Sequence, residues 1–268
     1  MTRLREALAP GKALIPYLTA SDPSEEAFFE AALGAIEGGA RVLEVGIPFS
    51  EPVADGPVIQ AAHQRALRAG GGAASALSQV RRLREAAGVP IVLFSYLNPV
   101  LAFGLQRFAR EARDAGADGI LLLDAPPAEE GDVLDPFREA GLDTVVLVTP
   151  NTTRERAAEL LRRASGFVYL VSRSGVTGAN GGAGDHVRER VRMVRGLTDL
   201  PVAVGFGVAD SAGVSAVWQM AEGAVVGSAL VNRLEGVPLS GRRAEARDFV
   251  RELSGARTCM AAREGVRP

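Results

Sequence analysis

The chain has 268 residues, of which 47% are hydrophobic and 23% are charged, a composition typical of a globular protein with a substantial apolar core. A formal net charge of −2, from 30 basic and 32 acidic residues, argues against a broad nucleic-acid-binding surface. With a single cysteine, Cys259, and neither a signal peptide nor a membrane span visible, we expect a cytoplasmic protein with residues 1–268 in one domain.

One pattern recurs along the chain, in which a helical segment, a glycine, a short apolar run and a loop follow one another. Glycine after a helix accommodates the left-handed C-cap conformation, and short runs of valine, isoleucine and leucine are typical of buried parallel strands. In chain order, the predicted strands are 13–18, 41–45, 91–94, 119–123, 144–148, 167–171, 202–204 and 224–226. The predicted helices are 25–37, 58–69, 76–87, 106–115, 129–140, 154–164, 186–195, 211–220 and 242–252.

This alternation of strands and helices predicts the fold. Eight strand–helix alternations in a chain of this length favour an α/β fold, a single-domain (β/α)8 TIM barrel with extra helices. A doubly wound open sheet is the alternative that the same alternation allows. Because the active site of a TIM barrel forms at the C-terminal ends of its strands, the residues that follow each strand are the candidates for function.

The most informative segment is 43–60, LEVGIPFSEPVADGPVIQ, which contains a glutamate inside an apolar strand. Glu44 shares one strand face with Val42 and Gly46, and the apolar residues between them suit the side that faces the helices, so Glu44 is expected to point into the barrel. Burial should raise the pKa of its carboxyl, which suits a proton donor near neutral pH. A structural glutamate bonded by a neighbouring tyrosine or serine is the alternative. For Asp55, a turn or helix cap is as good an interpretation as catalysis.

Glycine-rich loops follow the last three predicted strands. Gly207 follows the seventh strand, while Gly227 and Ser228 follow the eighth and precede a short helical stretch. Loops after strands seven and eight are the usual phosphate site of this fold, because backbone N–H groups and a helix N-terminus favour an anion. These three residues therefore predict a phosphate site, with tight turns that need glycine as the alternative. For the loop 174–182, the sequence is equally compatible with phosphate binding and with a loop that is simply mobile.

Other chemically capable residues give weaker signals. Asp124 ends the fourth strand and is either a third catalytic acid or a residue that organises its loop, and Tyr169 is a candidate to line the same pocket. His63 and His186 fall in predicted helices and are interpreted as surface residues. The chain has no clustered histidines and cysteines, no hydrolase triad spacing and no GxxxxGK[ST] motif, so neither a metal site nor an ATP-binding loop is predicted.

Six segments in order, together spanning nearly the whole chain, resemble the α subunit of tryptophan synthase. They are 43–60, YLNPV at 96–100, LLLDAPPAEE at 121–130, YLVSRSGVTG at 169–178, VGFGV at 204–208 and VVGSALV at 225–231. The longest of them, 43–60, is highly specific. The resemblance implies a carbon–carbon lyase that cleaves indole-3-glycerol phosphate to indole and glyceraldehyde 3-phosphate without a metal or organic cofactor of its own.

The resemblance also implies roles for individual residues. Glu44 and Asp55 match the catalytic pair. Tyr169 matches a pocket residue near the glycerol chain, and Thr177 matches a loop threonine that contacts the aspartate when the sixth loop closes. The positions around the indole ring are Tyr17, Phe94, Leu121, Val148 and Phe206, and those of the phosphate site are Gly178, Gly207, Gly227 and Ser228.

Members of this family pair with a pyridoxal-phosphate-dependent β subunit in an α2β2 complex, and indole passes between the subunits through a tunnel. The matching contact residues are Glu51, Pro52, Asn98, Pro99, Asp124 and Pro126. Glu51 departs from the pattern, because many relatives carry aspartate there and the glutamate extends its charge one methylene further. The alternatives are a lyase that acts alone, another phosphosugar-binding barrel enzyme and a non-catalytic barrel that serves only as a partner.

Overall fold

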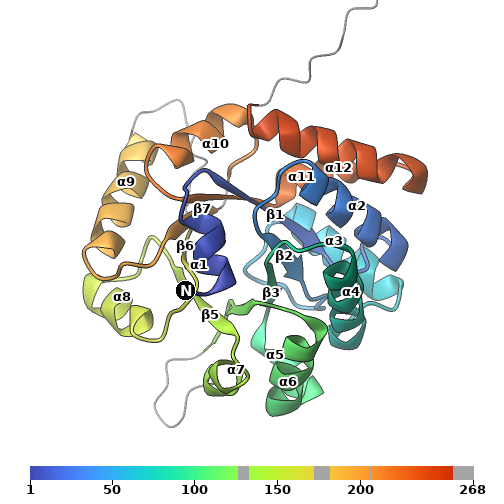
Figure 1. Ribbon diagram of the computed structural model, residues 1–268, viewed down its shortest axis with the longest axis horizontal. Helices are drawn as coiled ribbons and strands as arrows, with labels where there is room; N and C mark the ends of the chain where they lie inside the picture. The colour runs from blue at the N-terminus through green and yellow to red at the C-terminus, as the bar shows by residue number, and fades with distance from the viewer. Residues whose placement is uncertain (126–132, 172–181, 206, 256–268) are drawn as a thin grey trace, which may run out of the picture.

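The computed structural model describes residues 1–125, 133–171, 182–205 and 207–255. Eight parallel strands close into a barrel in the order in which they occur in the chain, with helices around it (Figure 1). The strands are β1 (Ala13–Thr19), β2 (Leu43–Gly46), β3 (Ile91–Ser95), β4 (Gly119–Leu122), β5 (Asp143–Val148), β6 (Val168–Val171), β7 (Val202–Gly205) and β8 (Gly223–Val226). The pairing of β8 with β1 confirms the predicted TIM barrel and excludes the open sheet.

The helices follow the predicted pattern, with differences at several ends. They are α1 (Arg3–Leu8), α2 (Glu25–Glu37), α3 (Pro57–Arg68), α4 (Ala73–Ala86), α5 (Leu97–Phe103), α6 (Leu105–Ala115), α7 (Asp135–Glu139), α8 (Arg154–Leu161), α9 (Gly182–Arg195), α10 (Ser211–Trp218), α11 (Ser228–Leu234) and α12 (Leu239–Leu253). Helices α1 and α5 were not predicted, because each spans only two turns or fewer and has a weak periodic pattern. The described part of the helix predicted at 129–140 is α7, and residues 129–132 lie outside the described residues.

Strand alternation divides the apolar interior into two clusters. Side chains such as Leu43 and Val45 point outward and pack against the helices. Side chains such as Val42, Val92 and Ile15 point inward and fill the barrel. Because successive residues of a strand face opposite sides, Glu44 falls on the inner face between two outward-facing neighbours, as the sequence predicted.

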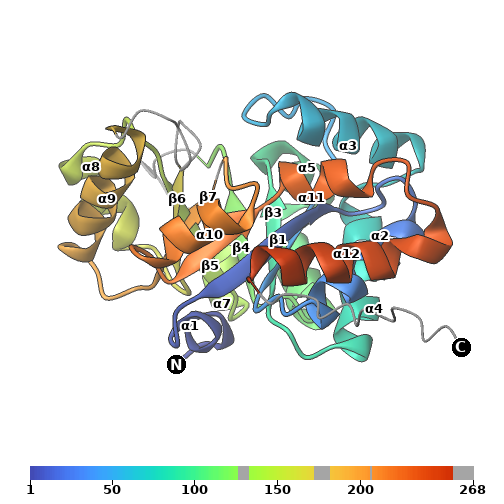
Figure 2. The same cartoon turned by 90° about the horizontal axis from the view of Figure 1, so that it is seen from above.

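Helix α1 closes the N-terminal end of the barrel. Leu4 and Leu8 are fully buried in the inner cluster, near the first residues of β4 and β8. Figure 2 shows α1 on one side of the barrel and helices α3 and α11 on the opposite side. The C-terminal end, which α3 and α11 border, is the end at which TIM barrels bind their ligands.

Candidate active site

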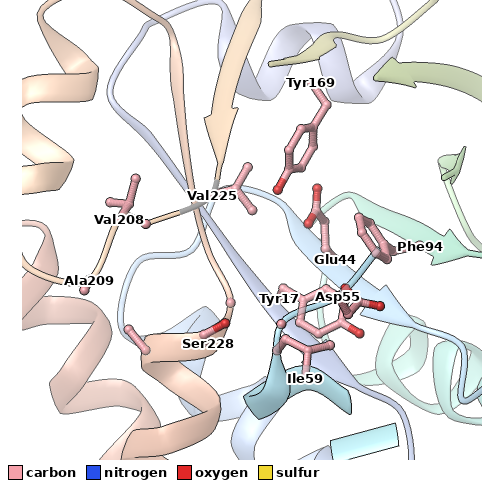
Figure 3. A pocket seen from close by; sticks show the side chains of 14 residues that line it. Tyr17, Glu44, Asp55, Ile59, Phe94, Tyr169, Val208, Ala209, Val225 and Ser228 are labelled. Carbon is pink, nitrogen blue, oxygen red and sulfur yellow. The ribbon is translucent and has the colours of Figure 1, made fainter. Parts of the chain in front are cut away.

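A cavity of about 190 Å³ lies at the C-terminal ends of the strands. It contains both predicted carboxylates and the described part of the predicted phosphate site (Figure 3). The residues that line it are Tyr17, Glu44, Asp55, Gly56, Ile59, Phe94, Tyr169, Gly207, Val208, Ala209, Val225, Gly227, Ser228 and Ala229. Groups from five strands, from the loops before α3 and after β7, and from the first turns of α3 and α11 therefore meet in one pocket.

Glu44 lies in the wall of this pocket on the inner face of β2. Its side chain is fully buried, and among the described residues neither carboxyl oxygen has a hydrogen-bond partner. The Tyr169 hydroxyl points toward the Glu44 carboxyl in Figure 3. Burial raises the pKa of Glu44 to about 8, because removal of water penalises the charged form. The carboxyl is therefore protonated at neutral pH and can serve as a proton donor.

Asp55 reaches the pocket from the loop between β2 and α3. The Tyr96 hydroxyl donates a hydrogen bond of 2.9 Å to Asp55 Oδ2 and accepts one of 2.9 Å from the Ala54 N–H. The Gln60 side chain donates to the Asp55 carbonyl oxygen at 2.8 Å. Burial and the nearby Asp55 raise the pKa of Tyr96, so its phenol stays protonated and remains a donor. These contacts fix the end of the loop that carries the carboxylate.

His63 contacts the same carboxylate, and its interpretation as a surface residue was wrong. The imidazole is 1% exposed, and its Nε2 lies 3.4 Å from Asp55 Oδ2. The buried residues of α3, which are Ile59, Ala62, His63 and Ala66, recur at helical spacing, and this pattern is the signal that the sequence analysis missed. His186 in α9 is exposed, as predicted.

Three aromatic rings form one wall of the pocket. Tyr17 and Phe94 pack edge to face with ring centroids 5.2 Å apart, and the centroids of Phe94 and Tyr169 are 6.5 Å apart. The Tyr17 hydroxyl is 3.2 Å from Thr19 Oγ1. Burial raises the pKa of Tyr17 and of Tyr169, so both phenols are neutral. An apolar, largely aromatic wall of this kind suits a flat apolar ring.

Two residues predicted near the ring occupy other positions. Leu121 lies in the inner cluster of the barrel but does not line the cavity. The prediction for Val148 was wrong, because this side chain packs in the outer cluster between the barrel and the helices. Its neighbour Leu147 pairs in register with Tyr169 and packs against the inner cluster. The alternation of β5 therefore directs Leu147, and not Val148, to the interior.

The other end of the pocket is built from glycines and a helix start. Gly207 has a φ of +77°, a left-handed conformation that favours glycine. Gly227 precedes Ser228, the first residue of α11. No lysine or arginine is among the described lining residues, so backbone N–H groups and the Ser228 hydroxyl are the donors available to an anion here. Thr177, Gly178 and Phe206 lie outside the described residues.

The predicted partner-contact residues lie around the same end of the barrel. Glu51, Asn98 and Asp124 are exposed, whereas Pro52 is buried and Pro99 is half-buried. Asp124 Oδ1 accepts a hydrogen bond of 2.6 Å from the Leu97 N–H at the start of α5. Asp124 does not line the cavity, so it organises a loop and is not a third acid of the pocket. Pro126 lies outside the described residues.

Across the described ranges, no group of three or more histidine, cysteine, aspartate or glutamate side chains is arranged to hold a metal ion. In the same part of the chain, no helix combines the length and the apolar character that crossing a bilayer requires.

Curated relatives resemble this chain over most of its length. The tryptophan synthase alpha chain of Solibacter usitatus (strain Ellin6076) is 46% identical over 224 residues, which cover 84% of this chain and 84% of the relative. The tryptophan synthase alpha chain of Polynucleobacter asymbioticus is 41% identical over 254 residues, which cover 94% of this chain and 96% of the relative.

Solved structures and a family model point the same way. A tryptophan synthase subunit alpha from Legionella pneumophila has a TM-score of 0.85 at 32% identity, covering 96% of this chain and 98% of that chain. An aminoacrylate-bound tryptophan synthase from Mycobacterium tuberculosis has a TM-score of 0.84 at 33% identity, covering 96% and 99%. The family model described as tryptophan synthase alpha chain matches residues 5–259. The chain therefore belongs to the tryptophan synthase alpha chain family.

Proposed function

We propose that the chain cleaves indole-3-glycerol phosphate to indole and glyceraldehyde 3-phosphate, as a carbon–carbon lyase in the last stage of tryptophan biosynthesis. The observation that carries the proposal is Glu44, a buried carboxyl with a pKa raised to about 8 that shares one cavity with Asp55 and the glycine-lined end. Glycines that serve only tight turns would not need to share a cavity with two carboxyl groups. A purely structural glutamate would be expected to have a hydrogen-bond partner. The family membership of the chain supports the same reaction.

The shape of the pocket supports a substrate with two different ends. The aromatic wall formed by Tyr17, Phe94 and Tyr169 suits the indole ring, and Asp55 lies beside this wall (Figure 3). The end formed by Gly207, Gly227 and Ser228 offers N–H groups and a hydroxyl to the phosphate. The glycerol chain would then lie between the two ends, where the Glu44 carboxyl borders the cavity.

The proposed reaction uses one neutral and one charged carboxyl group. Glu44 donates its proton to carbon 3 of indole, which produces an indolenine cation, and ionised Asp55 accepts a hydrogen bond from the ring N–H and stabilises that cation. The Glu44 carboxylate then takes the proton of the adjacent glycerol hydroxyl as the carbon–carbon bond breaks. The bonding electrons return to the ring, indole and the aldehyde are released, and Glu44 is protonated again. Division of labour between two carboxyls is common where environments push their pKa values apart.

Indole release from indole-3-glycerol phosphate by the purified chain tests this proposal. We expect Glu44→Gln and Asp55→Asn each to lower kcat by about 10²–10⁴-fold, because general acid catalysis or cation stabilisation is lost. The exposed His186 provides the control His186→Gln, which should keep the wild-type rate. Near-normal turnover by Glu44→Gln would refute the assigned role, and no indole from the wild-type chain would refute the reaction.

We further propose that the chain works with a pyridoxal-phosphate-dependent β subunit in an α2β2 complex in the cytoplasm. Val53 is 82% exposed and Leu101 is 49% exposed, and both lie close in sequence to predicted contact residues. A second cavity, of about 570 Å³, is lined by residues that include Phe49, Asn98 and Pro99. We propose that the partner covers these exposed apolar side chains and the cavity that Asn98 and Pro99 line.

Addition of a β subunit tests this part of the proposal. We expect the two proteins to co-elute and the rate of indole release to rise, and Leu101→Glu to weaken the complex without changing the rate of the isolated chain. A chain that reaches its full rate alone and does not co-elute would favour the lyase that acts independently.

A further inference from the structure

His63 contacts the loop between β2 and α3 at two places. His63 bridges two points of the loop between β2 and α3: its Nδ1 accepts a hydrogen bond of 3.2 Å from the Phe49 N–H, and its Nε2 lies 3.4 Å from Asp55 Oδ2. The imidazole is almost completely buried. One side chain of α3 therefore connects the beginning of the loop to the carboxylate near its end.

The Phe49 contact determines which imidazole nitrogen carries the proton. Because a backbone N–H only donates, Nδ1 must be the unprotonated acceptor, and the proton of the neutral ring must be on Nε2. Nε2 is the atom that faces Asp55 Oδ2. The Phe49 N–H thus selects the tautomer that presents a donor to the carboxylate.

The two side chains that approach Asp55 use the same oxygen. Tyr96 donates to Oδ2, and His63 Nε2 faces Oδ2, whereas no described contact falls on Oδ1. Asp55 also lines the cavity. The Tyr96 hydrogen bond and the His63 contact both fall on one oxygen, which leaves the other oxygen available to a ligand N–H.

We propose that His63 is a positioning residue that holds Asp55 through Nε2–H and so aims Oδ1 at the ring N–H of the substrate; this inference rests on the proposed function. At 3.4 Å the Nε2 contact lacks the alignment of a hydrogen bond, and Nε2 has no other partner among the described residues. A contact of this kind can shorten when the ligand engages Asp55, as is common at catalytic sites. The buried Nε2–H of His63 then gains a hydrogen-bond acceptor, which it otherwise lacks among the described residues.

Three substitutions separate the two ends of the bridge. His63→Asn places a carbonyl near the Nδ1 position and keeps only the Phe49 contact. His63→Gln places an amide N–H near the Nε2 position and keeps only the Asp55 contact. His63→Leu keeps the volume and neither contact. We expect kcat for indole release to fall about 10–100-fold in His63→Leu and His63→Asn, as is typical when the support of a catalytic group is lost, with KM changed less than about threefold.

Rescue by the glutamine variant is the decisive result. His63→Gln should return kcat to within about threefold of wild type, because it restores the donor to Oδ2. Rescue by His63→Asn in place of His63→Gln would overturn the inference, since holding the loop at Phe49 would then account for the whole effect. Wild-type kcat in His63→Leu would overturn it as well. Equal urea midpoints for the three variants separate these outcomes from unfolding.

The imidazole tautomer provides a readout that does not depend on turnover. Long-range proton–nitrogen NMR spectra of the full chain should show a protonated Nε2 and an unprotonated Nδ1 for His63, with exposed His186 as the internal reference. A proton on Nδ1 would overturn the inference, even if indole is formed. Failure of the wild-type chain to form indole would refute the proposed function, and the tautomer would then still decide the geometry assigned to His63.

Discussion

Each end of the barrel buries a carboxyl group, but one of these groups is surrounded by charged partners and the other is not. Asp118, which precedes β4 at the N-terminal end, is 8% exposed. It binds Arg3 at 2.9 Å and Arg84 at 2.5 Å and accepts a hydrogen bond of 2.8 Å from the Ile91 N–H. Glu44 at the C-terminal end is fully buried and has no hydrogen-bond partner among the described residues.

Under the proposed function, this difference separates a residue that stabilises the fold from a residue that performs chemistry. The partners of a buried charge offset the cost of its desolvation, so removing one partner is costly. A buried carboxyl without partners avoids the cost of its charge by staying protonated, which makes it a proton donor at neutral pH. The assignment of the two roles follows the general division of TIM barrels, with stability at one end and activity at the other.

The largest expected effect that distinguishes the two carboxyls is the pH dependence of the unfolding free energy. The pKa of Glu44 is about 8 in the folded protein and about 4.5 in the unfolded chain, so its contribution is complete below pH 4.5 and is lost as pH rises through 8. Between these limits the wild-type protein should lose as much as about 5 kcal/mol of unfolding free energy that Glu44→Gln does not lose. Urea unfolding of both proteins across this pH range measures the difference. Parallel pH profiles would contradict the account.

Asp118→Asn should have the next largest effect, and this effect should be confined to stability. The substitution leaves the partly buried guanidinium of Arg84 without its charged partner. We expect a loss of roughly 2–4 kcal/mol, less than for a fully buried pair because Arg3 is half exposed and its interaction is screened. Chemical unfolding measures the loss, and kcat of the folded fraction should be unchanged. A lower kcat at full folding would show that the two ends of the barrel are coupled.

Gly46→Ala should have a smaller effect, and it probes the packing of the pocket at the C-terminal end of the barrel. A Cβ at this position would lie 2.1 Å from the Tyr17 hydroxyl oxygen, so the tyrosine must leave its place in the pocket wall. We expect a loss of about 1–3 kcal/mol, typical of overpacking, and a lower kcat. Tyr17→Leu in the same chain should restore part of the stability.

A matched glycine provides the control for this prediction. A Cβ at Gly88 would meet no atom within 4 Å, so Gly88→Ala should leave unfolding and kcat unchanged. Wild-type stability in Gly46→Ala would show that the aromatic wall is looser than the structure indicates.

Most of the barrel and the central pocket could be predicted from the sequence. Short apolar runs after helix-ending glycines defined the strands to within two residues at each end, because buried parallel strands have few alternatives. The position of Glu44 followed from alternation along β2, and the presence of Gly207 and Gly227 in the cavity wall followed from their place in the loops after β7 and β8.

Two predictions from the sequence, for Val148 and His63, were wrong. Val148 was assigned by resemblance alone, and applying the alternation of β5 would have moved the assignment to Leu147. His63 was treated as a surface residue, although its helical spacing from Ile59 places both on the apolar face of α3. Its contact with Asp55 could not be predicted, because it depends on how the loop folds back over the helix.

Direct titration of the Glu44 carboxyl tests the central claim. NMR spectra of the chain with carbon-13-labelled glutamate side chains, compared with those of Glu44→Gln to assign the signal, report the ionisation of this one group. The account predicts a carboxyl that is protonated at pH 7 and titrates with a pKa of about 8. A Glu44 signal that titrates near the ordinary glutamate value of about 4.5 would contradict it.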